Sequence, residues 1–366
     1  MQALILAGGE GTRLRPLTAT VPKPVVPLVD RPFIAFMLDW LRGHGVDDVV
    51  ISCGFLASGV RNVLGDGSRW GVRLRYVEEP RPLGTGGAIK FAASLLDERV
   101  LVLNGDVLTD LDLTAQLAQH ERTGARLTLA LVSVEDPSAY GLVRLDDDGS
   151  VCGFLEKPSP DQIDTDLVNA GAYVLEREVL DGIPEGRTVS IERELFPTLV
   201  DNGLYGFRSD GYWLDIGTPD RYLQATHDIL DGAVRTSVPD AYDGRNVALA
   251  DDAEVLGRVV GPAHVGSGVR VAKGALVSGR TVLGRGVEVG AGAHVDGAVV
   301  LDGAVVGSNT TVTHAIIGPG AQLGSHCRVG KGVVLGEGVV LGDQNHLDAG
   351  ARVFPNVSLP DGAIKF

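Results

Sequence analysis

The second half of the sequence carries a repeat of six residues. From Val259 to Leu301 an aliphatic side chain returns at every sixth position, and after a slip the spacing resumes from Ile317 to Val353. The positions are Val259, Val265, Val271, Val277, Leu283, Val289, Val295 and Leu301, then Ile317, Leu323, Val329, Leu335, Leu341, Leu347 and Val353. Short fixed periods indicate stacked structural repeats. A flexible glycine-rich linker would not hold branched aliphatic residues in register.

A period of six predicts a three-sided parallel β-helix, with one inward aliphatic residue on each side. Small residues such as Gly318, Gly324 and Gly330 follow the inward position, where the chain turns a corner. This spacing is typical of the left-handed parallel β-helix of hexapeptide repeats. We therefore predict this fold for residues 247–366.

The sequence before residue 230 has a different pattern. Short apolar runs at 3–6, 49–52 and 100–103 alternate with helical patterns at 33–41 and 88–96. The alternation predicts an α/β fold, a Rossmann-like and mostly parallel sheet with helices on both faces. Sheets of this kind bind ligands at the carboxyl ends of their strands.

Thr218 and Pro219 supply an N-cap and a first-turn proline for a helix that leaves this α/β region. We predict an α/β domain over residues 1–228, a linker over 229–246 and the β-helix after it.

Charge and cysteine content limit the kinds of partner. The 366 residues have a formal charge of −15, which argues against a nucleic acid or an anionic membrane as partner. The three cysteines have no paired or metal-like spacing, as expected in a reducing compartment. No apolar run is long enough to span a membrane. We expect a soluble cytoplasmic protein in which any phosphate site is locally basic.

A glycine-rich turn follows the first predicted strand, in the run from Leu6 to Thr18. Such a turn exposes backbone N–H groups that can bind phosphate oxygens. A dinucleotide fingerprint would need glycine where Leu14 stands, and no Gly-Lys-Ser/Thr closes a P-loop. What remains is a glycine turn followed by two cations, Arg13 and Lys23.

Two aspartates stand at the ends of strand-like runs. Asp106 follows the apolar run 100–103, and Asp215 ends the run 212–215. A carboxylate at the carboxyl end of a strand can hold a hard cation that bridges phosphates, and a turn-forming aspartate is the equal alternative. Glu156, Lys157 and Asn169 add a carboxylate, an ammonium and an amide on other β-rich segments.

Together these segments resemble the sugar-1-phosphate nucleotidyltransferase family, in the same order and over nearly the whole chain. The run Gly9 to Thr18 is similar to the family's glycine-rich motif. The runs 190–197 and 359–362 look most like bacterial mannose-1-phosphate guanylyltransferases (GDP-mannose pyrophosphorylases) with a C-terminal left-handed β-helix. The resemblance implies transfer of a nucleotidyl group from a nucleoside triphosphate to a sugar 1-phosphate, with Mg²⁺ as cofactor.

The resemblance also implies roles for individual residues. Arg13 and Lys23 would be catalytic, and Asp106 and Asp215 would hold the metal. Gly141, Glu156, Lys157 and Asn169 would bind the sugar phosphate. The nucleotide would be bound by Leu6, Ala7, Gly8, Gly9, Gly11, Thr12, Glu79, Pro82, Gly84 and Thr85.

The base and the sugar are open at this stage. Glu79 stands where pyrimidine-specific relatives carry glutamine, and its carboxylate can accept from both N1–H and the N2 amine of guanine. We therefore favour GTP and mannose 1-phosphate. Glucose-1-phosphate thymidylyl- or uridylyltransferase activity is the alternative.

Two other classes compete less well. Hexapeptide β-helices often acylate sugars, and His264, His294, His314, His326 and His346 could be offered as bases. A non-catalytic regulatory paralogue would lose charged positions that this chain retains. β-Helices of this kind commonly associate, so we expect a homo-oligomer through the β-helix.

Overall fold

The computed structural model describes residues 1–54, 56–348 and 350–365. Packing divides the chain into two compact units. The first contains Met1–Glu10 and Ile34–Trp213, and the second contains Gly11–Phe33 and Leu214–Phe366. The segment 11–33 is therefore grouped with the C-terminal part of the chain. The boundaries at 228 and 247 stay predictions about how the sequence is organised.

The first unit is built on one mixed sheet with the order β10-β9-β11-β6-β1-β4-β5, in which β8 pairs with β11 and β12 pairs with β8. Its strands are β1 (Gln2–Ala7), β4 (Asp48–Cys53), β5 (Arg73–Glu78), β6 (Arg99–Asn104), β8 (Leu127–Ser133), β9 (Gly141–Leu145), β10 (Val151–Glu156), β11 (Leu167–Glu176) and β12 (Leu204–Arg208). Its helices are α1 (Phe33–Gly43), α2 (Ala57–Leu64), α3 (Gly84–Ala92), α4 (Leu113–Thr123) and α5 (Phe196–Leu199).

The predicted Rossmann-like sheet is confirmed. It is parallel from β6 through β1 and β4 to β5, whereas β11 runs antiparallel to β6, β8 and β9. β9 and β10 also pair antiparallel, because the turn 146–150 that joins them is too short for a parallel crossover.

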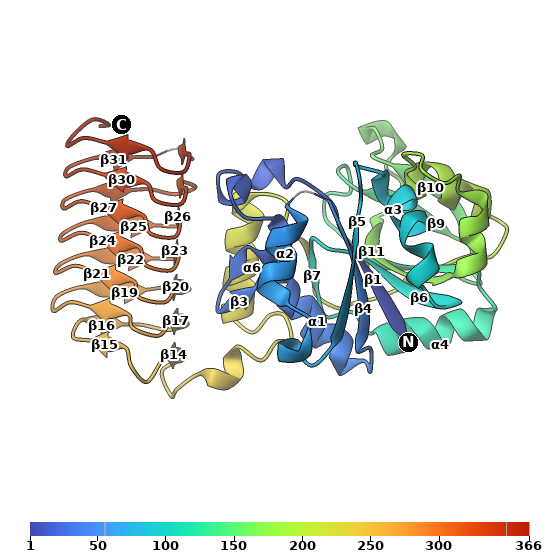
Figure 1. The fold of residues 1–366 in the computed structure, drawn as a ribbon, viewed down its shortest axis with the longest axis horizontal. Coiled ribbons are helices and arrows are strands. Elements are labelled where there is room, and N and C mark those ends of the chain that lie inside the picture. Colours follow the sequence, from blue (N-terminus) through green and yellow to red (C-terminus); the bar gives the residue numbers. More distant parts are fainter. Residues whose placement is uncertain (55, 349, 366) are drawn as a thin grey trace. The chain divides into compact units, whose positions relative to one another are not determined.

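The central strand β1 is buried on both faces. Leu4 packs in one cluster with Ile89 of α3, and Ala3 and Ile5 on the opposite face have no exposed surface. Strands buried in this way are nearly continuous apolar runs, as in Ala3–Ile5. Figure 1 shows β1 between β4 and β6, with helices packed around the sheet. Among the described residues, no helix is long and apolar enough to cross a membrane.

The second unit contains the C-terminal β-helix, in which every third strand pairs in parallel. Figure 1 shows these strands stacked in successive coils. The first sheet contains β14 (Val247–Leu249), β17 (Ala263–Val265), β20 (Thr281–Leu283), β23 (Val299–Val300), β26 (Ile316–Ile317), β29 (Val334–Leu335) and β32 (Arg352–Val353). The second contains β15 (Glu254–Val255), β18 (Arg270–Val271), β21 (Glu288–Val289), β24 (Val305–Val306), β27 (Gln322–Leu323), β30 (Val340–Leu341) and β33 (Ser358–Leu359). The third contains β16 (Arg258–Val259), β19 (Leu276–Ser278), β22 (His294–Asp296), β25 (Thr311–Thr313), β28 (Arg328–Val329) and β31 (His346–Leu347).

The six-residue repeat forms the interior of this β-helix, with one exception. The cluster inside the helix contains the predicted aliphatic residues from Val265 to Val295 and from Ile317 to Leu347. Between these two runs it contains Val300, so the prediction that Leu301 points inward is wrong. The irregularity is divided between two corners, since the steps from Val295 to Val300 and from Val312 to Ile317 are each one residue short.

The second unit also contains helix α6 (Pro219–Leu230) and the segment 11–33. That segment consists of short 3₁₀ turns and two short strands rather than a long element. They are η1 (Thr12–Leu14), η2 (Leu17–Ala19), η3 (Lys23–Val25), β2 (Pro27–Leu28) and β3 (Arg31–Pro32). Helix α6 begins as predicted, because the Thr218 hydroxyl accepts from the Arg221 N–H and Pro219 occupies the first turn.

Burial lowers the pKa of three histidines, His120, His227 and His264, below the ordinary value of 6.5. In the unfolded chain each histidine takes up a proton near pH 6.5, whereas in the folded protein it stays neutral to lower pH. Their contribution to the free energy of unfolding is present above pH 6.5 and is lost as pH falls below it.

We predict that the melting temperature of the wild type falls as the pH is lowered from 7.5 to 5.5, and that the fall is smaller in His120→Met. Thermal unfolding of both proteins at several pH values in this range gives the slope of melting temperature against pH for each. All other titrating groups are the same in the two proteins, so the difference between the slopes reports on His120. Equal slopes in the two proteins would contradict the assignment of this loss to His120.

Candidate functional site

The glycine turn after β1 lies against Glu79. A Cβ added to Gly8 would stand 2.8 Å from Glu79 Oε1, so the carboxylate occupies the space that a side chain would need. The carboxylate is held on both sides, because Oε1 accepts from the Ser52 hydroxyl at 3.0 Å and Oε2 accepts from the Leu83 N–H at 3.1 Å. Glu79 is therefore half-buried and fixed in orientation, with each oxygen keeping a second lone pair.

Gly84 begins the first turn of α3, shortly after Glu79 in the chain. Gly84 has a φ of 70°, and its Cβ position would lie 2.6 Å from the Val189 carbonyl oxygen. That carbonyl accepts from the N–H groups of Gly86 and Gly87. The Thr85 hydroxyl donates to Glu192 Oε2 at 2.7 Å and accepts from the Ile191 N–H at 2.9 Å. The start of α3 is thus tied to the segment 189–192.

The turn after β6 is pressed against the end of β1. The Gly105 N–H donates to the Leu6 carbonyl at 2.9 Å, and a Cβ on Gly105 would lie 2.6 Å from the same oxygen. Asp106 follows directly. Because Leu6 pairs with Ser52 on one side and Asn104 on the other, Gly8 after β1 and Asp106 after β6 share the carboxyl edge of the sheet.

Three of the predicted sugar-phosphate residues, Gly141, Glu156 and Lys157, lie around the end of β10, and the fourth, Asn169, lies on β11. Gly141 lies opposite Glu156, and a Cβ on Gly141 would lie 2.9 Å from Glu156 Oε2 and 2.6 Å from the Phe154 ring. Glycine at 141 therefore leaves room for the carboxylate. Lys157 has a φ of 52° and donates its N–H to the Tyr140 carbonyl at 3.0 Å, which ends the pairing at this point.

Glu156 lies in an unusual electrostatic environment. Burial raises its pKa above the ordinary value, the neighbouring carboxylate of Glu192 raises it further, and Lys157 and Arg193 oppose the shift. A carboxylate held this way is a strong acceptor for neutral donors such as sugar hydroxyls. Glu192 has no role predicted from the sequence. It accepts from the Thr85 hydroxyl and also acts on the charge of Glu156. Glu192 lies in the run 190–197, which resembles the family but does not by itself indicate a contact with Thr85 or Glu156.

Gly11, Thr12, Arg13, Lys23 and Asp215 belong to the second unit. Gly11 has a φ of 61°, and its carbonyl accepts from the Thr18 hydroxyl at 2.7 Å. The Lys23 side chain is buried against it. At Gly217 the Cβ position would lie 2.9 Å from Arg13 Nη2 and 3.1 Å from Asp215 Oδ2. A predicted catalytic cation and a predicted metal ligand thus meet over a glycine that follows β13 (Trp213–Asp215).

Two residues of the β-helix contact the segment 11–33 inside the second unit. Glu337 Oε2 accepts from the Thr20 hydroxyl at 2.8 Å. Arg352 Nη1 lies 3.4 Å from the carbonyl oxygen of Arg13 and 3.3 Å from that of Arg15. Neither contact can be predicted from the sequence, because a polar residue on the outer face of a repeat has the same pattern whether it faces solvent or another segment.

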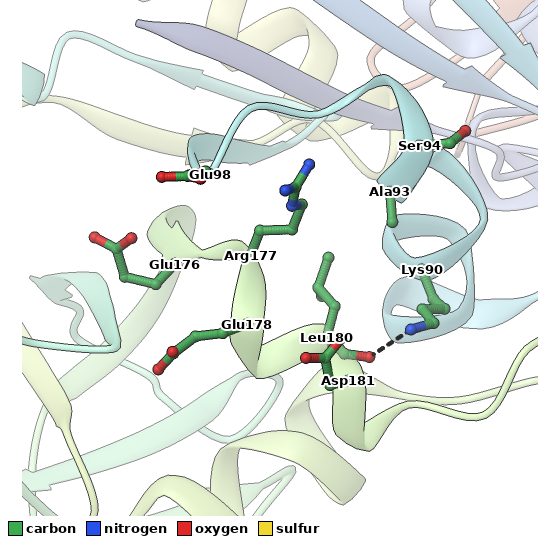
Figure 2. Close-up of a pocket in the computed structure, with 9 residues that line it drawn as sticks. All are labelled: Lys90, Ala93, Ser94, Glu98, Glu176, Arg177, Glu178, Leu180 and Asp181. Atoms are coloured by element: carbon green, nitrogen blue, oxygen red, sulfur yellow. Dashed lines mark hydrogen bonds between the residues drawn. The ribbon is translucent and has the colours of Figure 1, made fainter.

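A cavity of about 600 Å³ lies elsewhere on the first unit (Figure 2). It is at the start of β6 and the end of β11, and its lining is charged. Its two cations are engaged with backbone, since Lys90 donates to the Leu180 carbonyl at 3.0 Å and Arg177 donates to the Leu96 carbonyl at 2.9 Å. No residue predicted from the sequence lines this cavity.

Comparison with known proteins gives consistent matches. Residues 2–232 match the family model described as nucleotidyl transferase, and residues 239–347 match the EIF2B subunit epsilon LbH domain, a left-handed β-helix. The chain is 39% identical to mannose-1-phosphate guanylyltransferase of Mycobacterium tuberculosis, covering 79% of this chain and 76% of that protein. It is 35% identical to UTP–glucose-1-phosphate uridylyltransferase of Synechocystis, covering 78% of each. Among solved structures, HddC from Yersinia pseudotuberculosis complexed with GMP-PN is similar, with a TM-score of 0.54 and 29% identity over 61% of this chain and 97% of that one.

We predict that Gly105→Ala lowers the free energy of unfolding by roughly 1 to 3 kcal/mol, the usual cost of overpacking, because its Cβ would meet the Leu6 carbonyl at 2.6 Å. Gly43→Ala is the matched control, since that exposed position at the end of α1 has no described atom within 4 Å of an added Cβ. Denaturant unfolding measures both, and equal stability of the two variants would show that the turn tolerates the side chain.

Proposed function

Because the chain belongs to the nucleotidyl transferase family, we propose that it transfers a guanylyl group from GTP to mannose 1-phosphate, releasing pyrophosphate and forming GDP-mannose. The observation that carries this proposal is the similarity to mannose-1-phosphate guanylyltransferases over most of the chain. The nucleotide and the sugar phosphate are the substrate classes that the family implies.

The proposed reaction needs positive charge more than a general base. The nucleophile is a phosphate oxygen that is already anionic at neutral pH. The difficulty lies in bringing two polyanions together and in stabilising charge at the α-phosphorus during in-line displacement. We assign this task to Arg13 and Lys23 on the triphosphate and to Lys157 on the sugar phosphate. One preorganised electrostatic contact is worth roughly 10² to 10³ in rate.

Mg²⁺ is the proposed cofactor, with Asp106 and Asp215 as its protein ligands. Among the residues that the structure describes, no group of three or more His, Cys, Asp or Glu side chains could hold a metal. Carboxylates in ones and twos fit Mg²⁺, which is usually held by one or two protein carboxylates together with substrate phosphates and water. When bound, the ion would neutralise phosphate charge. Arg13 and Asp215 both lie close to the Cβ position of Gly217, which supports a role for this carboxylate beside the triphosphate.

The sugar side is proposed to be formed by Glu156 and Asn169. The half-buried Glu156 would accept from a hydroxyl, and Gly141 leaves the space in which it stands. Lys157 follows directly in the chain and carries the charge that the sugar phosphate needs. A charged hydrogen bond of this kind is worth about 1.5 to 3 kcal/mol.

Glu79 is the residue that we propose recognises the base of the nucleotide. Its half-buried carboxylate is fixed by Ser52 and Leu83 beside Gly8, which supports a recognition role over free exposure to solvent. Guanine offers two adjacent donors to such a group, whereas uracil and thymine place acceptors beside their single donor. A site with an unmatched buried polar group discriminates strongly. Uridylyl transfer to glucose 1-phosphate is the second candidate, favoured by the similarity to the Synechocystis enzyme.

We predict that kcat/KM is highest for GTP among GTP, UTP, dTTP and ATP with mannose 1-phosphate, and that Glu79→Gln narrows this preference. Glutamine can accept from the Leu83 N–H through its oxygen and donate to the Ser52 hydroxyl through its nitrogen, so the variant keeps the side chain in place while removing the charge and one acceptor. Pyrophosphate release measures each pair, with glucose 1-phosphate run in parallel. A wild type that prefers UTP or dTTP would end the guanine proposal, and an unchanged preference in the variant would remove Glu79 from it.

We predict that chelation of divalent cations abolishes turnover, that Mg²⁺ restores it, and that Asp215→Asn loses most turnover while keeping its melting temperature. Asp220→Asn, an exposed carboxylate in the first turn of α6, is the matched control and should behave as wild type. Near-full Mg²⁺-dependent turnover in Asp215→Asn would exclude this ligand.

Association through the β-helix into a homo-oligomer and a cytoplasmic location also stay proposals. They follow from the repeat architecture, the low cysteine content and the acidic charge of the chain.

A further inference from the structure

Strand β11 contains a bulge at the residues predicted to meet the sugar. Asn169 lies opposite Leu131 of β8, and Tyr173 lies opposite Leu129, so four steps along β11 span only two steps along β8. Bulges of this kind turn side chains away from the regular alternation and are frequent beside functional sites. Residues 170–172 have no partner in β8, although Ala172 pairs with Leu103 of β6, so backbone groups of the bulge bond to partners other than β8.

The bulge is held from three directions. The Ala170 carbonyl accepts from Trp213 Nε1 at 2.8 Å, and the Ala172 carbonyl accepts from Gln116 Nε2 at 3.2 Å. Between them, Gly171 has a φ of 75°, and a Cβ there would lie 2.7 Å from Asn104 Nδ2. Asn104 precedes the turn that carries Asp106, so the bulge packs directly on the predicted metal-binding turn.

Gln116 is an unusual residue for its position. It lies on the buried face of α4, has no exposed surface, and donates from Nε2 to the carbonyls of Thr128 and Ala172 at 3.1 and 3.2 Å. Both partners can only accept, which fixes the orientation of the amide. Among the described residues, Gln116 Oε1 has no hydrogen-bond partner. A buried acceptor left in this state costs about 1 to 3 kcal/mol, so the two donated bonds are what this residue provides.

The bulge in turn orients Asn169. Asn169 Oδ1 accepts from the Gly171 N–H at 2.9 Å, and Nδ2 donates to the Tyr173 hydroxyl at 3.0 Å. Tyr173 is fully buried and does not move freely. The amide of Asn169 therefore depends on the Gly171 N–H and on the Tyr173 hydroxyl, and the carbonyl of Ala172 between these two residues is held by Gln116.

We propose that Gln116 is a positioning residue for the sugar-phosphate side of the site, acting through the β11 bulge on Asn169. The proposal rests on the function given above, in which Asn169 meets a sugar hydroxyl. Without the donor of Gln116, the buried Ala172 carbonyl loses this hydrogen bond, and the bulge relaxes towards another arrangement. Asn169 then moves with it, whereas Gly8 and Glu79, which follow β1 and β5, keep their own contacts.

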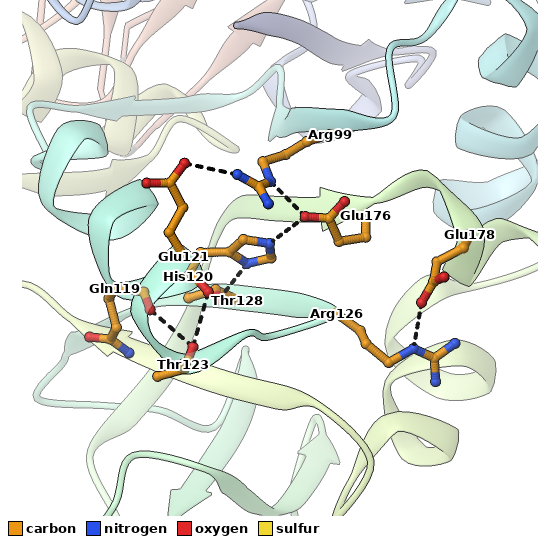
Figure 3. Close-up of polar contacts among 9 residues, drawn as sticks. All are labelled: Arg99, Gln119, His120, Glu121, Thr123, Arg126, Thr128, Glu176 and Glu178. Atoms are coloured by element: carbon orange, nitrogen blue, oxygen red, sulfur yellow. Dashed lines mark hydrogen bonds and ion pairs between the residues drawn. The ribbon is translucent and has the colours of Figure 1, made fainter.

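The test compares Gln116→Met with His120→Met. Methionine matches glutamine in length and removes only the polar atoms. His120 is the control because it lies one turn further along α4, is equally buried, and bonds to Thr128 Oγ1 at 2.8 Å and to Glu176 at 3.1 Å, at the end of β11 remote from the bulge (Figure 3). Both variants lose buried hydrogen bonds to β8 and β11, so both are expected to melt at lower temperature.

We expect Gln116→Met to raise the KM for mannose 1-phosphate at saturating GTP about tenfold, the equivalent of one well-placed hydrogen bond, with the KM for GTP unchanged. His120→Met should leave both KM values unchanged. An unaltered KM for the sugar phosphate in Gln116→Met, or equal KM changes in the two variants, would overturn the proposal. If Gln116→Met does not fold, Gln116→Asn withdraws the donor by one methylene and carries the same expectation.

Amide hydrogen exchange gives a second result that needs no substrate. We expect faster exchange over residues 169–175 in the Gln116 variant than in His120→Met, and equal exchange there would overturn the proposal. If the wild type instead turned over a different pair of substrates, the proposed function would fail, while exchange at the bulge would still decide the role of Gln116.

Discussion

The close approach of three strand ends is the constraint on which the site depends. Gly105 donates to the Leu6 carbonyl, and Gly171 lies against Asn104. Each contact leaves no room for a Cβ, so the end of β1, the turn after β6 and the bulge of β11 form one packed layer. The layer places the predicted base-binding, metal-binding and sugar-binding residues of the first unit on neighbouring strand ends. A side chain added at Gly105 would meet the Leu6 backbone, and one added at Gly171 would meet the Asn104 side chain, so either change disturbs neighbouring parts of the layer.

The residues proposed to bind the sugar phosphate include a carboxylate, Glu156, whose ionised form is disfavoured by burial and by Glu192. Glu156 and Glu192 raise each other's energy when both are ionised, and burial adds to the cost at Glu156. Glu192 is stabilised by the hydroxyls of Thr85 and Ser190, and Lys157 and Arg193 offset the charge at Glu156. A substrate that donates from hydroxyls and carries a phosphate would relieve both sides of this arrangement. The strain of a positive φ at Lys157 is consistent with a residue placed for binding rather than for the fold.

The sequence predicted the elements whose pattern is periodic. The β-helix follows from aliphatic residues at every sixth position, and the parallel half of the first sheet follows from buried runs such as Ala3–Ile5. The exact register at Val300 could not be predicted, because Val300 and Leu301 are both aliphatic and either fits the interior. The antiparallel half was missed for a similar reason, since alternation of apolar residues does not reveal the direction of a neighbour.

The candidate site divides in the same way. Residues within short motifs, such as Gly8 or Glu156, could be named from the sequence, although their roles stay proposals. Gln116 could not, because a glutamine among polar helix residues looks exposed until the partner carbonyls are placed. Glu192 lay in a run that was noticed only for its resemblance. Both act through contacts across more than 50 positions of sequence, which no local pattern contains.

The grouping of residues 11–33 with the β-helix bears on what that domain does. The segment carries Arg13 and Lys23, and it has no long helix or strand to hold its shape. Instead its carbonyls and Thr20 meet Arg352 and Glu337, and Gly11 leaves room for the Lys23 side chain. These bonds are exposed and the two from Arg352 are long, so each is weak alone. Buried side chains such as Leu14, Val25 and Leu28 also hold the segment, and these bonds add to that restraint. The β-helix therefore contributes to the order of the proposed phosphate-binding cations within its own unit, in addition to any role in association.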